Sequence, residues 1–365
     1  MPDLRTYLDL HPAAAEVRGR AITGRRIRSK APLRLSFCGG GTDVLPYAAE
    51  CGGLVLNATI DRYAYATIVC NDQSELVVRS LDYNLTQAFD LEQPAVYDGQ
   101  LDLVKAAVRW LNAQTNGGHI GFELNLHTDA PPGSGLGSSS AVVVAMLHAF
   151  STWRRIPLTA YELAHLAYLL EREELQISGG MQDQYAAAFG GFNFMEFDGA
   201  DVVVNPLRVA SETVNELEYS LVLCYTGGTR LSAGIIETQV ENYSSGDEHV
   251  LDAMENLKEL TVALKNALVL GRLSEFGALL GEAWHNKKQM AQQVTTPRID
   301  EIYEEAMRAG ALGGKVTGAG GGGYMYFFCP GETRHKVIGR LEELGLQATR
   351  VTFEPQGVQA WEAGL

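Results

Sequence analysis

The chain has 365 residues, enough for two domains, and its 46% hydrophobic and 20% charged residues are ordinary for a folded globular protein. A formal net charge of -15 argues against a nucleic-acid partner and against an anionic membrane surface, since both require a basic footprint. The five cysteines are scattered and never form a CxxC pair, which favours the reducing cytoplasm over disulfides or zinc.

The N-terminal stretch carries charges and has no apolar core of the secretory type. The longest apolar run, near residues 141–150, is too short to span a bilayer, so we expect no membrane partner. We interpret residues 1–24 as an amphipathic or partly disordered extension. Arginines cluster at its end, at positions 18, 20, 25 and 26. An oligomer contact, such as that of a homodimer, or plain surface is favoured over a catalytic role.

Residues 27–38 are strand-like, interrupted at Pro32, and lead into Gly39–Gly41, Thr42 and Asp43. Consecutive glycines indicate a turn with positive φ or a backbone pressed against a ligand. Asp43 either caps a helix over residues 45–51 or accepts hydrogen bonds from substrate hydroxyls. Lys30 and Arg34 share one face of the strand. Further strands are expected at residues 54–57, 63–70 and 75–80, and a helix at residues 101–112.

The stretch from Pro131 to Ala141 lies between an alternating strand at residues 121–128 and an apolar helix at residues 141–150. Its glycines permit close backbone approach, its serines supply hydroxyl donors, and the helix start leaves N–H groups free. These features predict a cradle for a nucleotide's phosphates. A flexible Gly/Ser linker is the alternative, but a linker is not expected between a core strand and a buried helix.

Two familiar phosphate motifs do not fit this stretch. A P-loop requires lysine after its last glycine, and the dinucleotide motif requires a third glycine, but Ser138 follows Gly137. A formal GxGxxG match begins at Gly318. It leads into an apolar strand at residues 324–328 rather than a helix, so we reject it as a dinucleotide site.

Residues 159–175 predict a helix with a Thr159–Glu162 capping box, ending in three glutamates at positions 171, 173 and 174. Glycines then precede a short helix in which Asp183 lies near the N-terminus. The helix dipole favours an ionised carboxylate there. Asp183 either stabilises the helix end or orients a hydroxyl and takes its proton.

A hairpin is expected at residues 192–197 and 202–207, and a composition shift at residues 209–216 marks the predicted boundary between domains 25–208 and 209–365. The second half predicts a strand at 219–225, helices at 248–268, 273–292 and 298–309, and an α-β-β-α-β end of ferredoxin-like type with its last helix at 333–344 and last strand at 347–353. We interpret His285, Lys287 and Lys288 as more often surface than site. The glycine tract at 318–323 is expected to abut the cradle or its ligand.

Three glycine-rich stretches in this order, with an aspartate between the second and third, resemble the GHMP kinase superfamily. The matching segments are Ser29 to Asp43, Pro131 to Ala141 and Lys315 to Gly323. The resemblance implies an α+β, two-domain GHMP kinase fold. Its N-terminal mixed αβ domain would be ribosomal S5-like and bind ATP, and its C-terminal domain would be ferredoxin-like. Within the superfamily, these segments and Gly179 to Tyr185 look most like D-glycero-D-manno-heptose 7-phosphate kinases.

The resemblance implies ATP and Mg²⁺ as cofactors and assigns roles by position. Asp183 would be the catalytic carboxylate and Arg34 the cation that stabilises the transferring phosphoryl group. Ser139 and Glu171 would bind the metal, although a helical wheel does not choose Glu171 over its neighbouring glutamates. The cofactor-binding residues would be Pro132, Gly133, Ser134, Gly135, Leu136, Gly137, Ser138, Ser139 and Ser140. The substrate-binding residues would be Lys30, Gly40, Gly41, Thr42, Asp43, Gly180, Thr317, Gly318, Ala319 and Gly320.

Galactokinases carry Glu-His where this chain has Gly40-Gly41, which argues against galactose and leaves room for a bulkier sugar. The first hypothesis is therefore an ATP-dependent kinase for the anomeric hydroxyl of heptose 7-phosphate, serving nucleotide-activated heptose for surface glycans. Another sugar 1-kinase, for fucose or an N-acetylhexosamine, is the alternative. A non-catalytic sugar sensor is disfavoured because Asp183 is present. Lys30, Arg230 and Lys287 are candidate clamps for the substrate phosphate.

Overall fold

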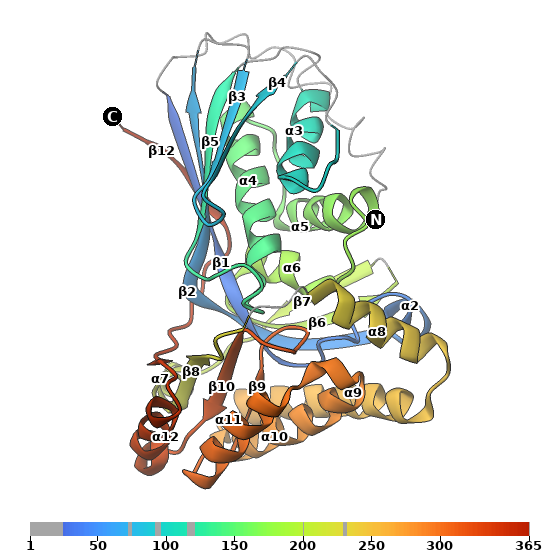
Figure 1. Ribbon diagram of the computed structural model, residues 1–365, viewed down its shortest axis with the longest axis vertical. Coiled ribbons are helices and arrows are strands. Elements are labelled where there is room, and N and C mark those ends of the chain that lie inside the picture. The colour runs from blue at the N-terminus through green and yellow to red at the C-terminus, as the bar shows by residue number, and fades with distance from the viewer. Residues whose placement is uncertain are drawn as a thin grey trace.

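The computed structural model describes residues 25–71, 75–91, 96–114, 121–199, 201–228 and 232–364. The expected N-terminal extension, residues 1–24, and the candidate clamp Arg230 lie outside these residues. The described chain forms a larger sheet covered by helices on one face and a smaller sheet packed on a second group of helices (Figure 1). This arrangement is the α+β class that the sequence predicts.

The larger sheet is mostly antiparallel, with the path β12-β1-β2-β5-β3-β4 and a branch in which β6 pairs with β2 and β7. Its strands are β1 (Arg26–Cys38), β2 (Gly53–Cys70), β3 (Glu75–Ser80), β4 (Leu85–Asp90), β5 (Phe122–Thr128), β6 (Phe192–Asp198), β7 (Asp201–Pro206) and β12 (Gln359–Ala363). The predicted hairpin of β6 and β7 is confirmed.

Two expectations about these strands are corrected. β1 continues through Pro32, because a register shift between Pro32 and Leu33 accommodates a residue without an N–H donor. The separate strands expected at residues 54–57 and 63–70 are one strand, β2. Its first part pairs with β6 and its second with β5. Residues 55–60 are buried on both faces, so the alternating pattern that marks a half-exposed strand is lost there.

Helices cover one face of the larger sheet (Figure 1): α3 (Asp102–Gln114), α4 (Ser138–Arg154), α5 (Ala160–Tyr168) and α6 (Gln182–Phe189). α4 is almost wholly buried and contacts β1 and β2, as its apolar sequence predicts. The Thr159–Glu162 capping box is present. The helix expected to run to residue 175 changes at Leu169 to a π-helical segment, η2 (Leu169–Glu174), a distortion often found at functional sites.

The smaller sheet has the order β11-β8-β10-β9 and is antiparallel throughout. In chain order this is 4-1-3-2, the order of a ferredoxin-like sheet. Its strands are β8 (Leu221–Tyr225), β9 (Gly313–Val316), β10 (Tyr324–Phe328) and β11 (Ala348–Thr349). β11 is shorter than the strand expected at residues 347–353. The helices nearby are α7 (Ser211–Ser220), α8 (Ser232–Ser244), α9 (Glu248–Val269), α10 (Leu273–Gln289), η3 (Gln292–Val294), α11 (Pro297–Arg308) and α12 (Gly331–Glu343).

The connection between the two sheets passes through α7, which begins at Ser211 and leads directly into β8. After β11 the chain returns to the larger sheet, where β12 pairs with β1. α9 packs against β1 and β2, so the second group of helices reaches the strand that leads into the Gly39–Asp43 turn. That turn is followed by the short α2 (Tyr47–Cys51).

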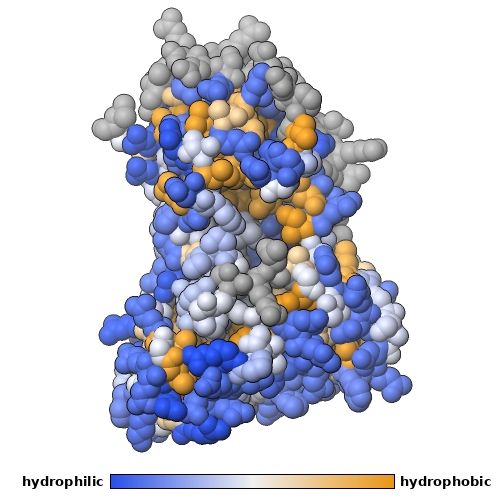
Figure 2. Space-filling view, viewed as in Figure 1, coloured by the Kyte–Doolittle hydropathy of each residue, from blue (hydrophilic) through white to orange (hydrophobic). Residues whose placement is uncertain are grey.

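The visible surface is mostly hydrophilic over the half that carries the smaller sheet, and its apolar side chains gather mainly over the other half in separate groups (Figure 2). Within the described ranges, no helix combines the length and the apolar character needed to cross a membrane.

Candidate active site

The glycine-serine loop between β5 and α4 has the geometry of an anion cradle. Gly133, Gly135 and Gly137 have φ angles of 72°, 79° and 75°, which residues with a Cβ rarely adopt. α4 begins at Ser138, and its N-cap, Gly137, makes no side-chain cap hydrogen bond. The first-turn N–H groups therefore point out of the helix at the positive end of its dipole. The Ser134 hydroxyl is also buried without a partner among the described residues. These groups fit the phosphates of a nucleotide.

The C-terminal glycine tract lies directly against this loop, as expected. The Thr317 hydroxyl donates to the Ser134 carbonyl at 3.2 Å, and the Tyr324 N–H donates to the same oxygen at 3.0 Å. A Cβ at Gly135 would lie 2.5 Å from the Thr317 carbonyl oxygen, and one at Gly323 would lie 2.3 Å from that of Ser134. Backbone meets backbone here, so a side chain at either glycine would separate the tract from the loop.

Arg34 joins the loop to Asp183. Its Nε donates to Asp183 Oδ1 at 2.8 Å, and a second guanidinium nitrogen lies 2.7 Å from the same oxygen. A third donates to the Gly135 carbonyl at 2.5 Å. A Cβ at Gly137 would lie 3.3 Å from the Asp183 carboxylate. Residues more than 100 positions apart in sequence therefore meet at one point. Arg34 is 4% exposed, while 20% of the Asp183 side chain remains accessible.

Glu171 is distinguished from its neighbouring glutamates by burial and by its partner. It is 1% exposed and accepts a hydrogen bond from Gln184 Nε2 at 2.5 Å; the same nitrogen donates to the Ser140 hydroxyl at 3.1 Å. Glu173 is exposed and Glu174 bonds Arg109 at 2.7 Å. Of the three glutamates, only Glu171 is therefore connected, through Gln184, to the first turn of α4.

The predicted metal ligands, Ser139 and Glu171, offer oxygen donors, the type that Mg²⁺ takes. Ser139 is exposed in the first turn of α4, where a bound phosphate chain would lie. Among the residues that the structure describes, no three His, Cys, Asp or Glu side chains come together as a metal cage. Mg²⁺ is commonly held by one or two carboxylates, water and substrate phosphates, so a single carboxylate with a hydroxyl is compatible with it.

Asp43 is buried and does not cap α2, so that interpretation is wrong. The N-cap of α2 is Pro46. Asp43 Oδ1 accepts from the Gly41 N–H at 2.9 Å, and Oδ2 accepts from the Gln182 N–H at 3.1 Å, at the start of α6. A Cβ at Gly180 would lie 2.0 Å from Oδ2. Asp43 therefore ties the glycine turn after β1 to the helix that carries Asp183.

The sequence favoured a surface position for Lys287 over a place in the site. The structure corrects this, because the side chain is buried beside the glycine turn. It is 4% exposed, and its Nζ donates to the Gly40 carbonyl at 2.8 Å and to Gln239 Oε1 at 3.2 Å. Burial, with a smaller effect of nearby Lys315, lowers the pKa of Lys287 to about 7. The available signal was the apolar stripe of α10 at Phe276, Leu280 and Trp284, which Lys287 continues at helical spacing.

Lys315 in β9 is a second buried lysine near the same turn. It is 4% exposed and donates to the Phe37 carbonyl at 3.2 Å. Burial lowers its pKa to about 8. The sequence motif contains Lys315, but local pattern did not indicate that its ammonium group reaches β1 rather than a ligand.

The remaining predicted substrate residues differ in placement. The Thr42 hydroxyl is buried and donates to the Gly39 and Leu54 carbonyls. Lys30 lies over the Tyr63 ring at 4.3 Å. Four residues of strand, about 13 Å, separate Lys30 from Arg34, and no contact found in the described chain joins it to the other site residues.

The other members of the predicted sets line the junction between loop and tract. Leu136 is buried and its carbonyl accepts from the Arg34 N–H. Gly318 lies against Gly135, and Gly320 against Val294. The Ala319 carbonyl accepts from Gln239 Nε2 at 3.5 Å. Pro132 and Ser138 belong to the loop and first turn already described.

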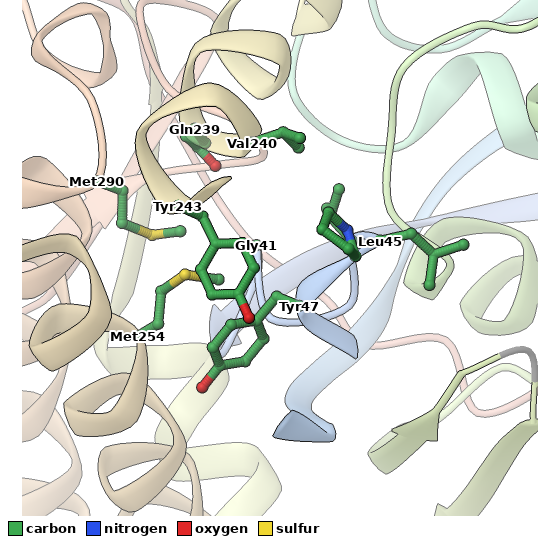
Figure 3. A pocket seen from close by; sticks show the side chains of 10 residues that line it. Gly41, Leu45, Tyr47, Gln239, Val240, Tyr243, Met254 and Met290 are labelled. Carbon is green, nitrogen blue, oxygen red and sulfur yellow. The ribbon is translucent and has the colours of Figure 1, made fainter. Parts of the chain in front are cut away.

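A small pocket lies beside the glycine turn, and Figure 3 shows the side chains around it. Its volume is about 10 Å³, room for about one water molecule. Gly41, Gln239, Tyr243 and Met290 are part of its lining, and a Cβ at Gly41 would lie 2.6 Å from Met290 Cε. The pocket marks where α8 packs on the turn, and it is too small to be a sugar site.

Comparison with known proteins agrees with this geometry. The model of the GHMP kinases N-terminal domain matches residues 102–191, and that of the GHMP kinases C-terminal domain matches residues 254–346. The D-glycero-alpha-D-manno-heptose 7-phosphate kinase of Campylobacter jejuni is 38% identical over 92% of this chain and 99% of its own length.

A crystal structure described as a D-glycero-D-manno-heptose 1-phosphate kinase from Bacteroides thetaiotaomicron superposes with a TM-score of 0.78 at 37% identity, covering 93% of this chain and 100% of the other. A more distant relative, the L-fucokinase/L-fucose-1-P guanylyltransferase of Bacteroides fragilis, is 28% identical over 81% of this chain but only 34% of its own length. Both halves of the chain, its fold and the meeting of its three glycine-rich segments lead to one conclusion: the chain belongs to the GHMP kinase family.

Proposed function

We propose that the protein transfers the γ-phosphoryl group of ATP to the anomeric hydroxyl of D-glycero-D-manno-heptose 7-phosphate, forming the 1,7-bisphosphate. The observation that carries this proposal is the junction of Asp183, Arg34 and the glycine-serine loop, because it directs a carboxylate and a cation at the end of a phosphate cradle. The choice of sugar is supported by the similarity to a heptose 7-phosphate kinase over nearly the whole chain.

In this proposal the chain supplies position and charge, which is what phosphoryl transfer asks of a protein. Asp183 would accept a hydrogen bond from the sugar hydroxyl, orient it and take its proton. Arg34 would hold Asp183 through two nitrogens and stabilise the charge that develops on the transferring group. The loop and the first turn of α4 would bind the β- and γ-phosphates.

Ser139 and Glu171 would hold Mg²⁺, with Gln184 fixing the carboxylate. When bound, the ion neutralises charge on the phosphates. The Gln184–Glu171 hydrogen bond supports this assignment, because it fixes the buried carboxylate beside the first turn of α4. The free thiols, including four buried ones, support a further proposal that the enzyme works in the reducing cytoplasm.

The similarity to a heptose 7-phosphate kinase supports a sugar phosphate over a simple hexose. Gly40 and Gly41 do not leave open space beside the turn, because an added Cβ would lie 3.2 Å from Gln182 Nε2 at Gly40 and 2.6 Å from Met290 Cε at Gly41. A fucose-type sugar 1-kinase is the second candidate, supported by the similarity to an L-fucokinase. The two candidates differ in whether the substrate carries a phosphate.

The test combines a substrate screen with one substitution. Purified protein is offered ATP, Mg²⁺ and a panel of free sugars and sugar phosphates, and ADP release is followed. Phosphorylation of heptose 7-phosphate with the new phosphate on C1 is expected. Asp183→Asn should lower kcat at least about 100-fold while ATP binding persists. Asp252→Asn, an exposed aspartate on α9, is the matched control. Turnover of free fucose but no heptose 7-phosphate would refute the assignment.

A further inference from the structure

Gln182, which the motif comparison does not assign, has an unusual environment beside the proposed site. It is the first residue of α6 and directly precedes Asp183. We propose that Gln182 is a substrate-binding residue that reads one neutral hydroxyl of the sugar, through a hydrogen bond donated to its Oε1. This inference rests on the proposed function, since it concerns the acceptor of the same reaction.

The nitrogen end of the Gln182 carboxamide is anchored. Its Nε2 lies 3.5 and 3.4 Å from the two carboxylate oxygens of Asp43, while its backbone N–H donates to Oδ2 at 3.1 Å. Only the nitrogen can face a carboxylate favourably, because turning the amide over would place two acceptors together. The orientation of the side chain is therefore set by Asp43.

The oxygen end is buried and has no donor. Gln182 is 7% exposed, and its Oε1 has no hydrogen-bond partner among the described residues. A buried acceptor left unpaired is costly, and such atoms in native proteins are usually completed by water or a ligand. Since Nε2 faces Asp43, Oε1 points away from that carboxylate, and no described group donates to it.

The surroundings select a hydroxyl over a phosphate. Both oxygens of Asp43 already accept backbone N–H groups, from Gly41 and Gln182. A phosphate placed here would meet an acceptor and a carboxylate, whereas a hydroxyl donates to Oε1 without adding charge. The substrate's phosphate would therefore lie away from Gln182.

The chain also limits which hydroxyl is read. Consecutive Cα atoms are about 3.8 Å apart, so Gln182 and Asp183 present their side chains at the same end of α6. Gly40 flanks the amide, since a Cβ there would lie 3.2 Å from Nε2. A hydroxyl near Gln182 is thus expected to be a ring neighbour of the one that Asp183 orients.

A deoxy-sugar scan with Gln182→Met tests the assignment. Methionine keeps the length of the side chain and removes the amide. The wild type is expected to lose about 10- to 100-fold in kcat/KM on one monodeoxy analogue of its sugar. The kcat/KM of the variant on the parent sugar should fall by a similar factor. The variant should then no longer distinguish the parent sugar from that analogue. Its KM for ATP should stay within about twofold.

Gln100→Met, at an exposed glutamine, is the matched control and should keep the wild-type profile. If the methionine variant does not fold, Gln182→Asn serves as the second variant. It should lose the same discrimination between the parent sugar and the analogue. The proposal is overturned if the variant still distinguishes every analogue from the parent sugar as the wild type does, or if its kcat/KM falls by the same factor on every analogue. It is also overturned if the wild type has the same kcat/KM on the parent sugar and on every monodeoxy analogue.

The proposed function is tested separately by the wild type alone. If it phosphorylates a sugar other than heptose 7-phosphate, the heptose assignment fails and the scan is run on the sugar that is used. Discrimination lost at one position of that sugar would still support the role of Gln182.

Discussion

Replacing Lys287 by methionine should change the stability of the protein in a pH-dependent manner. The lysine is buried between the Gly40 carbonyl and Gln239 Oε1, which are two acceptors for the two N–H donors of a neutral amine. Its pKa falls from 10.5 to about 7 on folding, chiefly because burial penalises the charged form. The folded protein therefore releases a proton that the unfolded chain retains.

The sign follows from the protons bound. Between pH 7 and 10.5 the unfolded state binds more protons at this residue, so the wild type gains stability as the pH rises. The gain is at most about 1.4 kcal/mol per pH unit, or about 2 to 3 kcal/mol between pH 7 and 9. Below pH 7 both states are protonated and the contribution becomes constant. The methionine variant lacks this dependence but also loses two hydrogen bonds, worth about 1 kcal/mol each.

The assay is urea unfolding of both proteins at several pH values, followed by tryptophan fluorescence, with the wild-type minus variant difference plotted against pH. Taking the difference removes titrations that the substitution leaves unchanged. Lys288→Met removes the neighbouring lysine of α10, whose side chain is 32% exposed, and reports the effect of losing a partly exposed lysine that pairs with Asp300. A Lys287 difference that stays flat between pH 7 and 9 would show that the folded protein keeps this lysine charged and would refute the reasoning.

Three further substitutions test the site and the fold. Gly180→Ala should lower kcat/KM for the sugar by about 10- to 100-fold and leave the KM for ATP nearly unchanged, because its Cβ would lie 2.0 Å from Asp43 Oδ2; unchanged sugar kinetics would contradict this. Glu171→Gln should raise the Mg²⁺ concentration needed for half-maximal rate about tenfold, and a metal titration showing no shift would argue against its role. Thr159→Ala should lower the free energy of unfolding by about 1 kcal/mol without affecting kcat, since it breaks the capping box with Glu162, and calorimetry together with a rate assay measures both.

Local pattern predicted the elements whose environment is uniform along the chain. The alternation before the glycine-serine loop predicts β5, and the apolar run after it predicts α4. β5 is predicted because one face of the strand is buried, and α4 is predicted because the helix is buried on nearly every face. β2 was predicted as two strands because the residues around Ala58 are buried on both sides, and period-two alternation disappears there.

Within the site, the sequence by itself determined the types of groups and their local settings: a glycine loop before a buried helix, and Asp183 in the first turn of another. Only the tertiary structure decided that Arg34 bridges Asp183 to the Gly135 carbonyl and that Lys287 is buried under the glycine turn. Propensity and periodicity depend on neighbours along the chain, whereas burial, charge pairing and a pKa depend on segments that only folding brings together.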